Sequence, residues 1–190
     1  MKPSTEDILG NAIQPSDKAL DFIVSDNYYQ WYYKIGVLKR PQTIVEFGVR
    51  YGYSSIALCR GANLVHVRPS LFLWDSEQDI PGCLEIAAAN ILPYASGIRV
   101  FKEDTKHARK LPGVLADIVH VDADHSDEGL RAELALADNM VWRDGWILVD
   151  DTNAKSIRDI TEDFAASRGY SVLRIPTLRG MIIIKPDPFS

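Results

Sequence analysis

The sequence predicts an α/β protein built on a doubly wound, mostly parallel sheet, and three features of the chain carry this prediction. Short apolar runs with strand character alternate with longer segments whose apolar residues recur at helical spacing. The first apolar run ends in a glycine-containing turn, and a helical pattern starts directly after it. Two apolar runs joined through Pro176–Gly180 predict a closing antiparallel hairpin. This combination is typical of a Rossmann-like sheet, here with seven strands.

The expected elements follow one another along the chain. A helical segment rich in aromatic residues extends from about Ser25 to Lys39. Apolar runs bounded by glycine, proline or acids predict strands at Thr43–Gly48, Leu71–Trp74, Ile98–Phe101, Asp117–Val121, Trp146–Val149, Tyr170–Ile175 and Met181–Lys185. Helices are expected between them at Tyr53–Gly61, Pro81–Leu92, Asp127–Trp142 and Ser156–Arg168. Pro81 suits a first helical turn, where its missing N–H needs no partner.

Composition limits the kind of protein and its partners. The 190 residues carry a net charge of -5 and are 46% hydrophobic, which suits one globular domain. We expect residues 1–40 to form a helical segment that packs on a core domain of residues 41–190. The absence of a basic run argues against a nucleic-acid partner. No apolar stretch approaches the roughly 20 residues that span a membrane. The first residues lack the apolar core of a signal peptide, so we expect a cytoplasmic protein.

Cysteine usage agrees with a reducing compartment. Cys59 and Cys83 lie inside expected helices and lack the spacing of metal ligands. We expect both to be buried free thiols.

The most distinctive motif spans residues 44–56, where a buried strand leads into a helix through Glu46-x-Gly48-x-x-x-Gly52-x-Ser54. Glycine at such a turn brings bare backbone close to a ligand at the open end of a parallel sheet. No G-x-G is present, so this is not the dinucleotide-binding fingerprint. An ordinary strand-to-helix turn that requires glycine is the alternative interpretation. The pattern resembles motif I of the class I methyltransferases that use S-adenosylmethionine (SAM).

Acids follow four of the first five expected strands, at Asp75, Asp104, Asp122 and the pair Asp150-Asp151. In an open parallel sheet these strand ends line the ligand crevice. The fourth and fifth strands should be neighbours, so Asp122 can converge with Asp150 and Asp151. Clustered carboxylates repel one another and favour a hard cation such as Mg²⁺, Mn²⁺ or Ca²⁺. The alternative is that these acids cap helices or form turns in water.

Two further segments resemble the divalent-metal-dependent O-methyltransferases: residues 118–129, with Asp-Ala-Asp-His-Ser-x-Glu-Gly, and residues 144–152. The branch that they resemble includes the macrolide sugar (macrocin-type) O-methyltransferases and cephalosporin-biosynthesis proteins, over about residues 40–185. The resemblance implies that Asp122, Asp150 and Asp151 hold the metal, with Asn153 as a fallback ligand. It also implies that His125 is the general base. Catechol-type relatives have lysine at this histidine position and asparagine as the second member of the acidic pair, so a catechol substrate is not expected.

The same resemblance implies a set of cofactor contacts. Glu46 and Gly48 would form the floor under the methionine part of SAM, and Gly52 and Ser54 would lie at the turn that receives its carboxylate. Asp75 would hold the ribose hydroxyls, with Glu77 as the alternative. Asp104 would lie near the adenine amino group, beside Glu103.

The histidines and the acids after the fourth strand also have structural interpretations. A histidine with a pKa near 6.5 can accept a proton at neutral pH, which suits His125 to base catalysis. It could equally hydrogen-bond a helix cap. Asp124, Ser126 and Asp127 are more easily explained as caps of the next helix than as ligand contacts. His120 lies inside the expected fourth strand and is expected to be a packed residue.

The resemblance, with the acidic cluster and His125, implies an enzyme that transfers the methyl group of SAM to a hydroxyl of a small molecule, a sugar or another natural product, with Mg²⁺ or another divalent cation. Transfer to nitrogen or carbon, SAM binding without turnover, and a nucleotide-cofactor oxidoreductase are the alternatives. Acceptor contacts are expected from Tyr28–Tyr33, Arg50–Tyr53 and Thr177–Arg179. Little chain remains for a lid, so either the site is open to a large acceptor or a second subunit of a homo-oligomer completes it.

Overall fold

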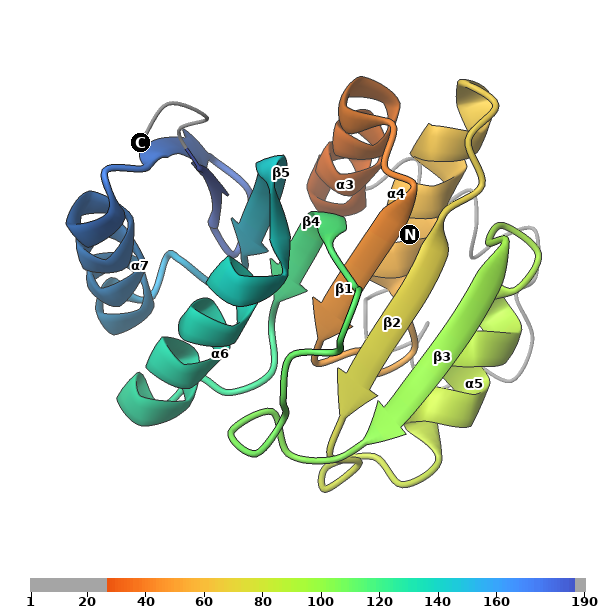
Figure 1. Ribbon diagram of the computed structural model, residues 1–190, viewed down its shortest axis with the longest axis horizontal. Coiled ribbons are helices and arrows are strands. Elements are labelled where there is room, and N and C mark those ends of the chain that lie inside the picture. Colours follow the sequence, from red (N-terminus) through yellow and green to blue (C-terminus); the bar gives the residue numbers. More distant parts are fainter. Residues whose placement is uncertain (1–26, 187–190) are drawn as a thin grey trace, which may run out of the picture.

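The computed structural model describes residues 27–186, which form one seven-stranded sheet between two layers of helices (Figure 1). The strand order is β3-β2-β1-β4-β5-β7-β6, and only β7 pairs antiparallel, with β5 on one side and β6 on the other. The expected doubly wound sheet with a C-terminal antiparallel hairpin is therefore confirmed. The start of the expected first helix at Ser25, with the rest of residues 1–26, lies outside the described residues.

Most element boundaries agree with the sequence pattern to within three residues. The strands are β1 (Thr43–Phe47), β2 (Ser70–Asp75), β3 (Gly97–Lys102), β4 (Ala116–Val121), β5 (Val141–Val149), β6 (Ser171–Ile175) and β7 (Met181–Lys185). The helices are α3 (Asn27–Lys39), α4 (Tyr53–Leu64), α5 (Cys83–Ile91), α6 (Asp127–Met140) and α7 (Lys155–Arg168).

The largest difference is the start of β5, at Val141 instead of Trp146, and two helix ends also differ for a clear physical reason. The sequence pattern extends α6 to Trp142, but the helix stops at Met140 and the strand β5 starts at the next residue. Val141 is extended and pairs with Ala116 of β4, so its side chain is buried as part of the sheet and not as part of the helix. Pro81 also lies outside α5, because Gly82 adopts a left-handed conformation (φ 78°) and the helix begins after it.

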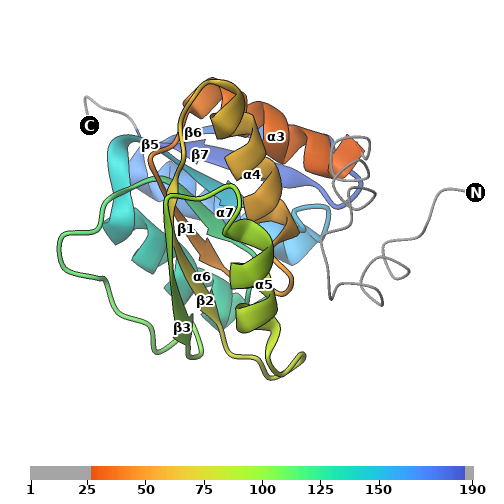
Figure 2. The same ribbon diagram turned by 90° about the vertical axis from the view of Figure 1, so that its right-hand side faces the viewer.

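Each face of the sheet has its own core. On one face, alternate strand residues such as Ile44 and Leu73 pack under α3, α4 and α5. On the other face, Val45 and Val121 pack under α6 and α7. Figures 1 and 2 show these two groups of helices on opposite sides of the sheet. No helix among residues 27–186 is long and apolar enough to cross a membrane. Cys59 and Cys83 are buried free thiols, as expected.

Helices α3 and α4 lie side by side with their backbones in direct contact (Figure 2). A β-carbon on Gly36 of α3 would lie 2.2 Å from the Leu58 carbonyl oxygen, and one on Gly61 of α4 would lie 2.1 Å from the Tyr33 carbonyl oxygen. The two helices can therefore approach this closely only because neither residue has a side chain. The close contact places α3, and with it Tyr28, beside the ends of the central strands.

This crossing predicts that Gly61→Ala destabilises the protein, although alanine is the better helix former by about 1 kcal/mol. The added methyl group must push two helix backbones apart, and such overpacking costs about 1–3 kcal/mol. Chemical denaturation should show a lower midpoint for the variant. Gly97→Ala, in β3, is the control for the added methyl group alone, since nothing lies within 4 Å of a β-carbon there. Equal stability of Gly61→Ala and the parent would contradict the assigned contact.

Candidate functional site

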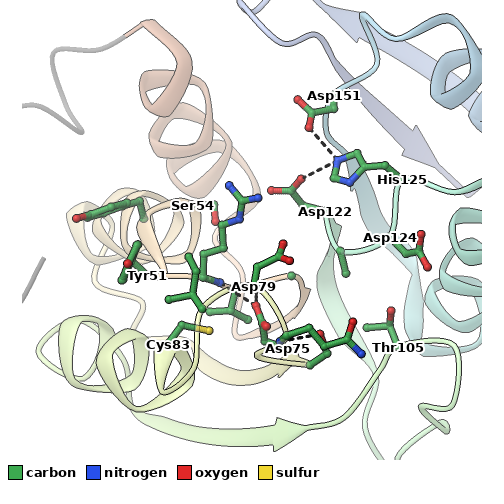
Figure 3. Close-up of a pocket in the computed structure, with 18 of the residues that line it drawn as sticks. Tyr51, Ser54, Asp75, Asp79, Cys83, Thr105, Asp122, Asp124, His125 and Asp151 are labelled. Atoms are coloured by element: carbon green, nitrogen blue, oxygen red, sulfur yellow. Dashed lines mark hydrogen bonds and ion pairs between the residues drawn. The ribbon is translucent and has the colours of Figure 1, made fainter. Parts of the chain in front are cut away.

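A cavity of about 330 Å³ opens at the carboxyl ends of the parallel strands. Segments after β1, β2, β3, β4 and β5 line it, together with the start of α3 and the turn between β6 and β7. The cavity brings together most of the residues that the sequence nominated, as Figure 3 shows in part. The nominated residues in its wall are Gly48, Ser54, Asp75, Asp104, Asp122, His125 and Asp151.

Three nominated residues, Glu46, Gly52 and Asp150, do not line this cavity. Glu46 is fully buried beneath it, and both of its carboxylate oxygens are engaged. It accepts hydrogen bonds from the Ser54 and Ser55 hydroxyls, and its Oε1 lies 2.8 Å from His120 Nδ1. Glu46 therefore supports the wall through Ser54 instead of contributing to it.

The two glycines of the first motif are required by packing within the protein. Gly48 has φ 79°, and a β-carbon there would lie 2.1 Å from the carbonyl oxygen of Asp122. Gly52 has φ 77°, and its β-carbon would lie 2.7 Å from Ile91 Cδ1 of α5. A larger residue at Gly48 would thus force apart the segments that follow β1 and β4, whatever ligand the cavity holds.

Asp75, at the end of β2, anchors the turn of the first motif. Its Oδ2 accepts from the backbone N–H groups of Val49 and Arg50, each at 3.0 Å, and its Oδ1 accepts from the N–H of Glu77 at 2.7 Å. The alternative acid, Glu77, lies outside the cavity wall. Its Oε1 accepts from the N–H of Leu84, and the ion pair with Lys102, at 2.7 Å, lowers the pKa of its carboxyl.

Asp104 and Glu103 follow β3 and face different surroundings. Asp104 lies in the cavity wall, and its Oδ1 accepts from the N–H of Lys106 at 2.9 Å. Glu103 lies outside that wall and accepts from Trp74 Nε1 at 2.9 Å. Of these two acids, only Asp104 is placed to contact a ligand in the cavity.

Asp122, His125 and Asp151 form a cluster at the opposite side of the cavity (Figure 3). His125 Nε2 lies 2.8 Å from Asp151 Oδ2 and 3.8 Å from Asp122 Oδ1. The hydrogen bond between His125 and Asp151 raises the pKa of His125 and lowers the pKa of Asp151. Burial raises the pKa of Asp122 to about 6. Asp151 has φ 54°, a strained backbone for a residue other than glycine.

Asp150 points into the protein, although it is adjacent to Asp151. It is 2% exposed and accepts a hydrogen bond from the Tyr28 hydroxyl of α3. Its Oδ1 is buried without a hydrogen-bond partner among the described residues. Burial raises the pKa of Asp150 to about 7.

Two overlapping groups of side chains could hold a metal ion. One consists of Asp122, His125 and Asp151, and the other of His120, Asp122 and Asp150. Within each group the potential ligand atoms lie within 4.8 Å of one another. The expected trio of Asp122, Asp150 and Asp151 is thus divided between the two groups. Each set combines two carboxylates with an imidazole, and such a donor set fits a divalent cation.

Contacts were expected from Tyr28–Tyr33 of α3, and Tyr28 and Tyr29 do lie in the cavity wall. The hydrogen bonds of this helix beneath the cavity were not predicted. The Tyr32 hydroxyl lies 3.0 Å from His120 Nε2 and 3.4 Å from the Tyr28 hydroxyl. A continuous buried network therefore runs from Asp150 through both tyrosines to His120 and Glu46. His120 is a packed residue, as expected, but it also adjoins the acidic cluster.

The turn between β6 and β7 contributes an arginine to the cavity. Arg179 Nη1 lies 3.8 Å from Asp151 Oδ1, and its guanidinium lies 5.5 Å from the centre of the Tyr28 ring. Asn153 holds this turn: its N–H donates to the Arg179 carbonyl oxygen, and its Nδ2 donates to that of Leu178. The role of Asn153 as a fallback metal ligand stays a prediction.

Comparisons with known proteins agree with this architecture. Residues 45–152, more than half of the chain, match a family model described as a methyltransferase domain. A search of curated proteins found no match.

Solved structures share the fold over nearly the whole chain. The methyltransferase PaMTH1 of Podospora anserina, bound to S-adenosylhomocysteine (SAH), is 16% identical, with a TM-score of 0.64 over 95% of this chain and 88% of that one. The O-methyltransferase of Bacillus cereus in complex with SAH is 20% identical, with a TM-score of 0.61 over 97% and 92%. TomG of Streptomyces achromogenes, in complex with SAM, is 18% identical, with a TM-score of 0.60 over 98% and 92%. At these identities the likeness establishes the fold alone.

The burial of Asp150 predicts a pH-dependent effect of Asp150→Asn on the metal-free protein. Because the folded state raises the pKa of this acid from 3.8 to about 7, ionisation opposes folding. The parent should lose stability relative to the variant as the pH rises from about 4 to about 7, by up to about 4 kcal/mol. Denaturation with chelator at several pH values measures the difference. Asp144→Asn, at an acid with a 78% exposed side chain, is the control for the substitution itself.

Proposed function

The chain belongs to the family of methyltransferase domains and has the class I fold, and on this premise we propose that it transfers a methyl group from SAM to a hydroxyl of a small molecule. The observation that carries the proposal is the composition of the cavity of about 330 Å³ described above. One side holds the turn of the first motif with Asp75 and Asp104, and the other holds Asp122, His125 and Asp151. Membership of the macrolide-sugar branch stays a prediction.

The cofactor would occupy the side of the cavity next to β1, β2 and β3. Asp75 and Asp104 offer carboxylates after neighbouring strands, which suits the hydroxyl and amino groups of adenosine. The backbone of Gly48 lies against the carbonyl group of Asp122, next to the acidic cluster, and Ser54 lies in the same cavity wall. The sulfonium end of SAM would have to be near this cluster for transfer. This orientation directs the reactive methyl group toward His125.

Two raised pKa values favour a bound cation. Burial makes the ionised forms of Asp122 and Asp150 unfavourable, and a divalent cation would stabilise these ionised forms. Asp122, Asp150 and Asp151 stay the predicted ligands. Because neither group contains all three, one cation would be held by Asp122 together with either Asp150 and His120 or Asp151 and His125. When bound, a divalent cation would supply Lewis acidity toward the acceptor hydroxyl.

His125 is the proposed general base. It would take the proton of the acceptor hydroxyl as the oxygen attacks the methyl carbon and the bond from carbon to sulfur breaks, leaving SAH. Asp151 accepts a hydrogen bond from the imidazole at 2.8 Å, so it orients the ring and stabilises its protonated form. The role of metal ligand is the alternative for His125, because it also belongs to one of the two metal-binding groups.

The acceptor side of the cavity combines aromatic rings with arginines. Tyr28 and Tyr29 come from α3, Tyr51 comes from the turn after β1, and Arg50 and Arg179 lie in the same wall. Tyrosine faces suit a sugar or a planar ring, and the guanidinium groups suit an acidic substituent. A panel of hydroxylated sugars and natural products, assayed by methyl transfer from labelled SAM, tests the proposed reaction.

SAM binding depends on Asp75 in this proposal. Asp75→Asn should weaken SAM binding by about 10- to 100-fold, because an amide accepts at one end only, whereas the carboxylate must accept from backbone N–H groups at both oxygens and from the ligand hydroxyls. Calorimetry measures the affinity. Glu77→Gln, at the alternative acid outside the cavity, is the matched control and should bind within about twofold of the parent. The reverse order of effects would assign the ribose to Glu77.

His125→Ala separates the two roles of the histidine. If His125 is the base, turnover should fall by about 10²- to 10⁴-fold while the affinity for Mn²⁺, measured by electron paramagnetic resonance, stays unchanged. Asp122→Asn should abolish Mn²⁺ binding, and chelator should abolish turnover of the parent. A large loss of Mn²⁺ affinity in His125→Ala would identify the histidine as a ligand. Full activity in chelator would exclude the metal.

A further inference from the structure

Glu133 is a buried acid on the apolar face of α6. It lies between Leu130 and Leu134, which pack on the sheet, and its side chain is fully buried. One carboxyl oxygen, Oε1, accepts hydrogen bonds from the Thr105 hydroxyl and from the N–H of Asp124, the latter at 3.1 Å. The other oxygen, Oε2, is buried without a partner in the described part of the chain.

Burial of a carboxyl group at such a position costs free energy, because the group loses its hydration, whereas an apolar side chain there would not. The two donors that Glu133 binds do not belong to α6. Thr105 follows β3 and Asp124 follows β4, and both lie in the wall of the large cavity. Glu133 thus connects the segment that follows Asp104 to the segment that carries Asp122 and His125.

Asp124 adds a second connection between the same segments. Its Oδ2 lies 2.6 Å from Lys106 Nζ, and its Oδ1 accepts from the N–H of Ser126 at 2.8 Å. The side chain fits against α6 only because residue 129 is glycine: a β-carbon on Gly129 would lie 2.1 Å from Asp124 Cγ. These contacts explain two members of the Asp-Ala-Asp-His-Ser-x-Glu-Gly motif, Asp124 and Gly129, for which the proposed reaction has no use.

We propose that Glu133 is a positioning residue, which acts through Thr105 and Asp124 to hold the segment with Asp122 and His125 at a fixed distance from the cofactor side of the cavity. The inference rests on the proposed function. Methyl transfer requires the attacking oxygen, the methyl carbon and the sulfur to lie in line, so a small shift of the acceptor side relative to the cofactor side is costly.

Glu133 can hold these segments as a hydrogen-bond acceptor, without being ionised. Burial raises the pKa of Glu133 to about 7, so the neutral form is favoured in the fold. Both connections use Oε1 as an acceptor, and a glutamine amide oxygen can accept the same two hydrogen bonds. Glutamine should therefore preserve the function of Glu133, whereas alanine removes the acceptor.

The experiment compares Glu133→Ala, Glu133→Gln and the parent, all as the full chain. Amide hydrogen exchange is followed by nuclear magnetic resonance without ligand, and SAH affinity is measured by calorimetry. We expect exchange of the Asp124 amide to become at least about tenfold faster in Glu133→Ala, with SAH binding weakened by about tenfold. Glu133→Gln should restore both. Glu128→Gln, at an exposed acid of the same helix, should match the parent.

A folded Glu133→Ala protein with parental exchange at residues 122–126 and parental SAH affinity would overturn the proposal. Equal defects in Glu133→Gln and Glu133→Ala would also overturn it, since the acceptor oxygen would then be irrelevant. If Glu133→Ala fails to fold, Thr105→Val decides: faster exchange at the Asp124 segment with weaker SAH binding supports the role, and parental behaviour overturns it. Failure of the parent to bind SAH refutes the proposed function, whereas the exchange measurement tests the contacts of Glu133 separately.

Discussion

Glu46 and His120 are opposite each other on the neighbouring strands β1 and β4, and solvent reaches neither side chain. Burial alone lowers the pKa of His120, but the hydrogen bond and the charge of Glu46 offset it and the net shift is upward. The Ser54 and Ser55 hydroxyls of α4 and the Tyr32 hydroxyl of α3 complete the pair. Loss of one partner from such a pair leaves a buried group unpaired, at a cost of about 3–5 kcal/mol. The pair therefore joins two strands and two helices beneath the cavity.

The acids above this pair are separated by the backbone that follows β5. The strand ends at Val149, and Asp151 has φ 54°, outside the extended region. Asp150 faces the protein interior, whereas Asp151 faces the cavity. The pKa of Asp150 rises with burial, while the hydrogen bond from His125 lowers the pKa of Asp151. Arg179 adds a positive charge on the cavity side. Neighbouring carboxyl groups with different ionisation are the usual basis for distinct roles in one site.

Sequence patterns predicted the parts of the site that depend on strand direction alone. Because parallel strands end at one edge of the sheet, Asp75, Asp104, Asp122 and Asp151 had to approach the same cavity. The position of Asp150 could not be predicted in this way, because it depends on the Tyr28 hydroxyl, far away in the sequence. The end of α6 was also misplaced, since the apolar spacing that marks a helix continues into the first residue of β5.

Glu133 was missed although a signal was present: residues 130, 133, 134 and 137 share one helix face, and only 133 is charged. A lone acid in an apolar stripe indicates a buried partner, but the sequence does not say that the partners follow β3 and β4. Gly48 and Gly129 are motif residues that the sequence did identify, but for another reason. Each is required because a β-carbon would collide with a neighbouring segment of the chain. Several residues that identify these motifs therefore serve to keep the segments around the cavity at a fixed spacing. Loss of activity on changing such a residue does not by itself assign it a contact with cofactor or acceptor.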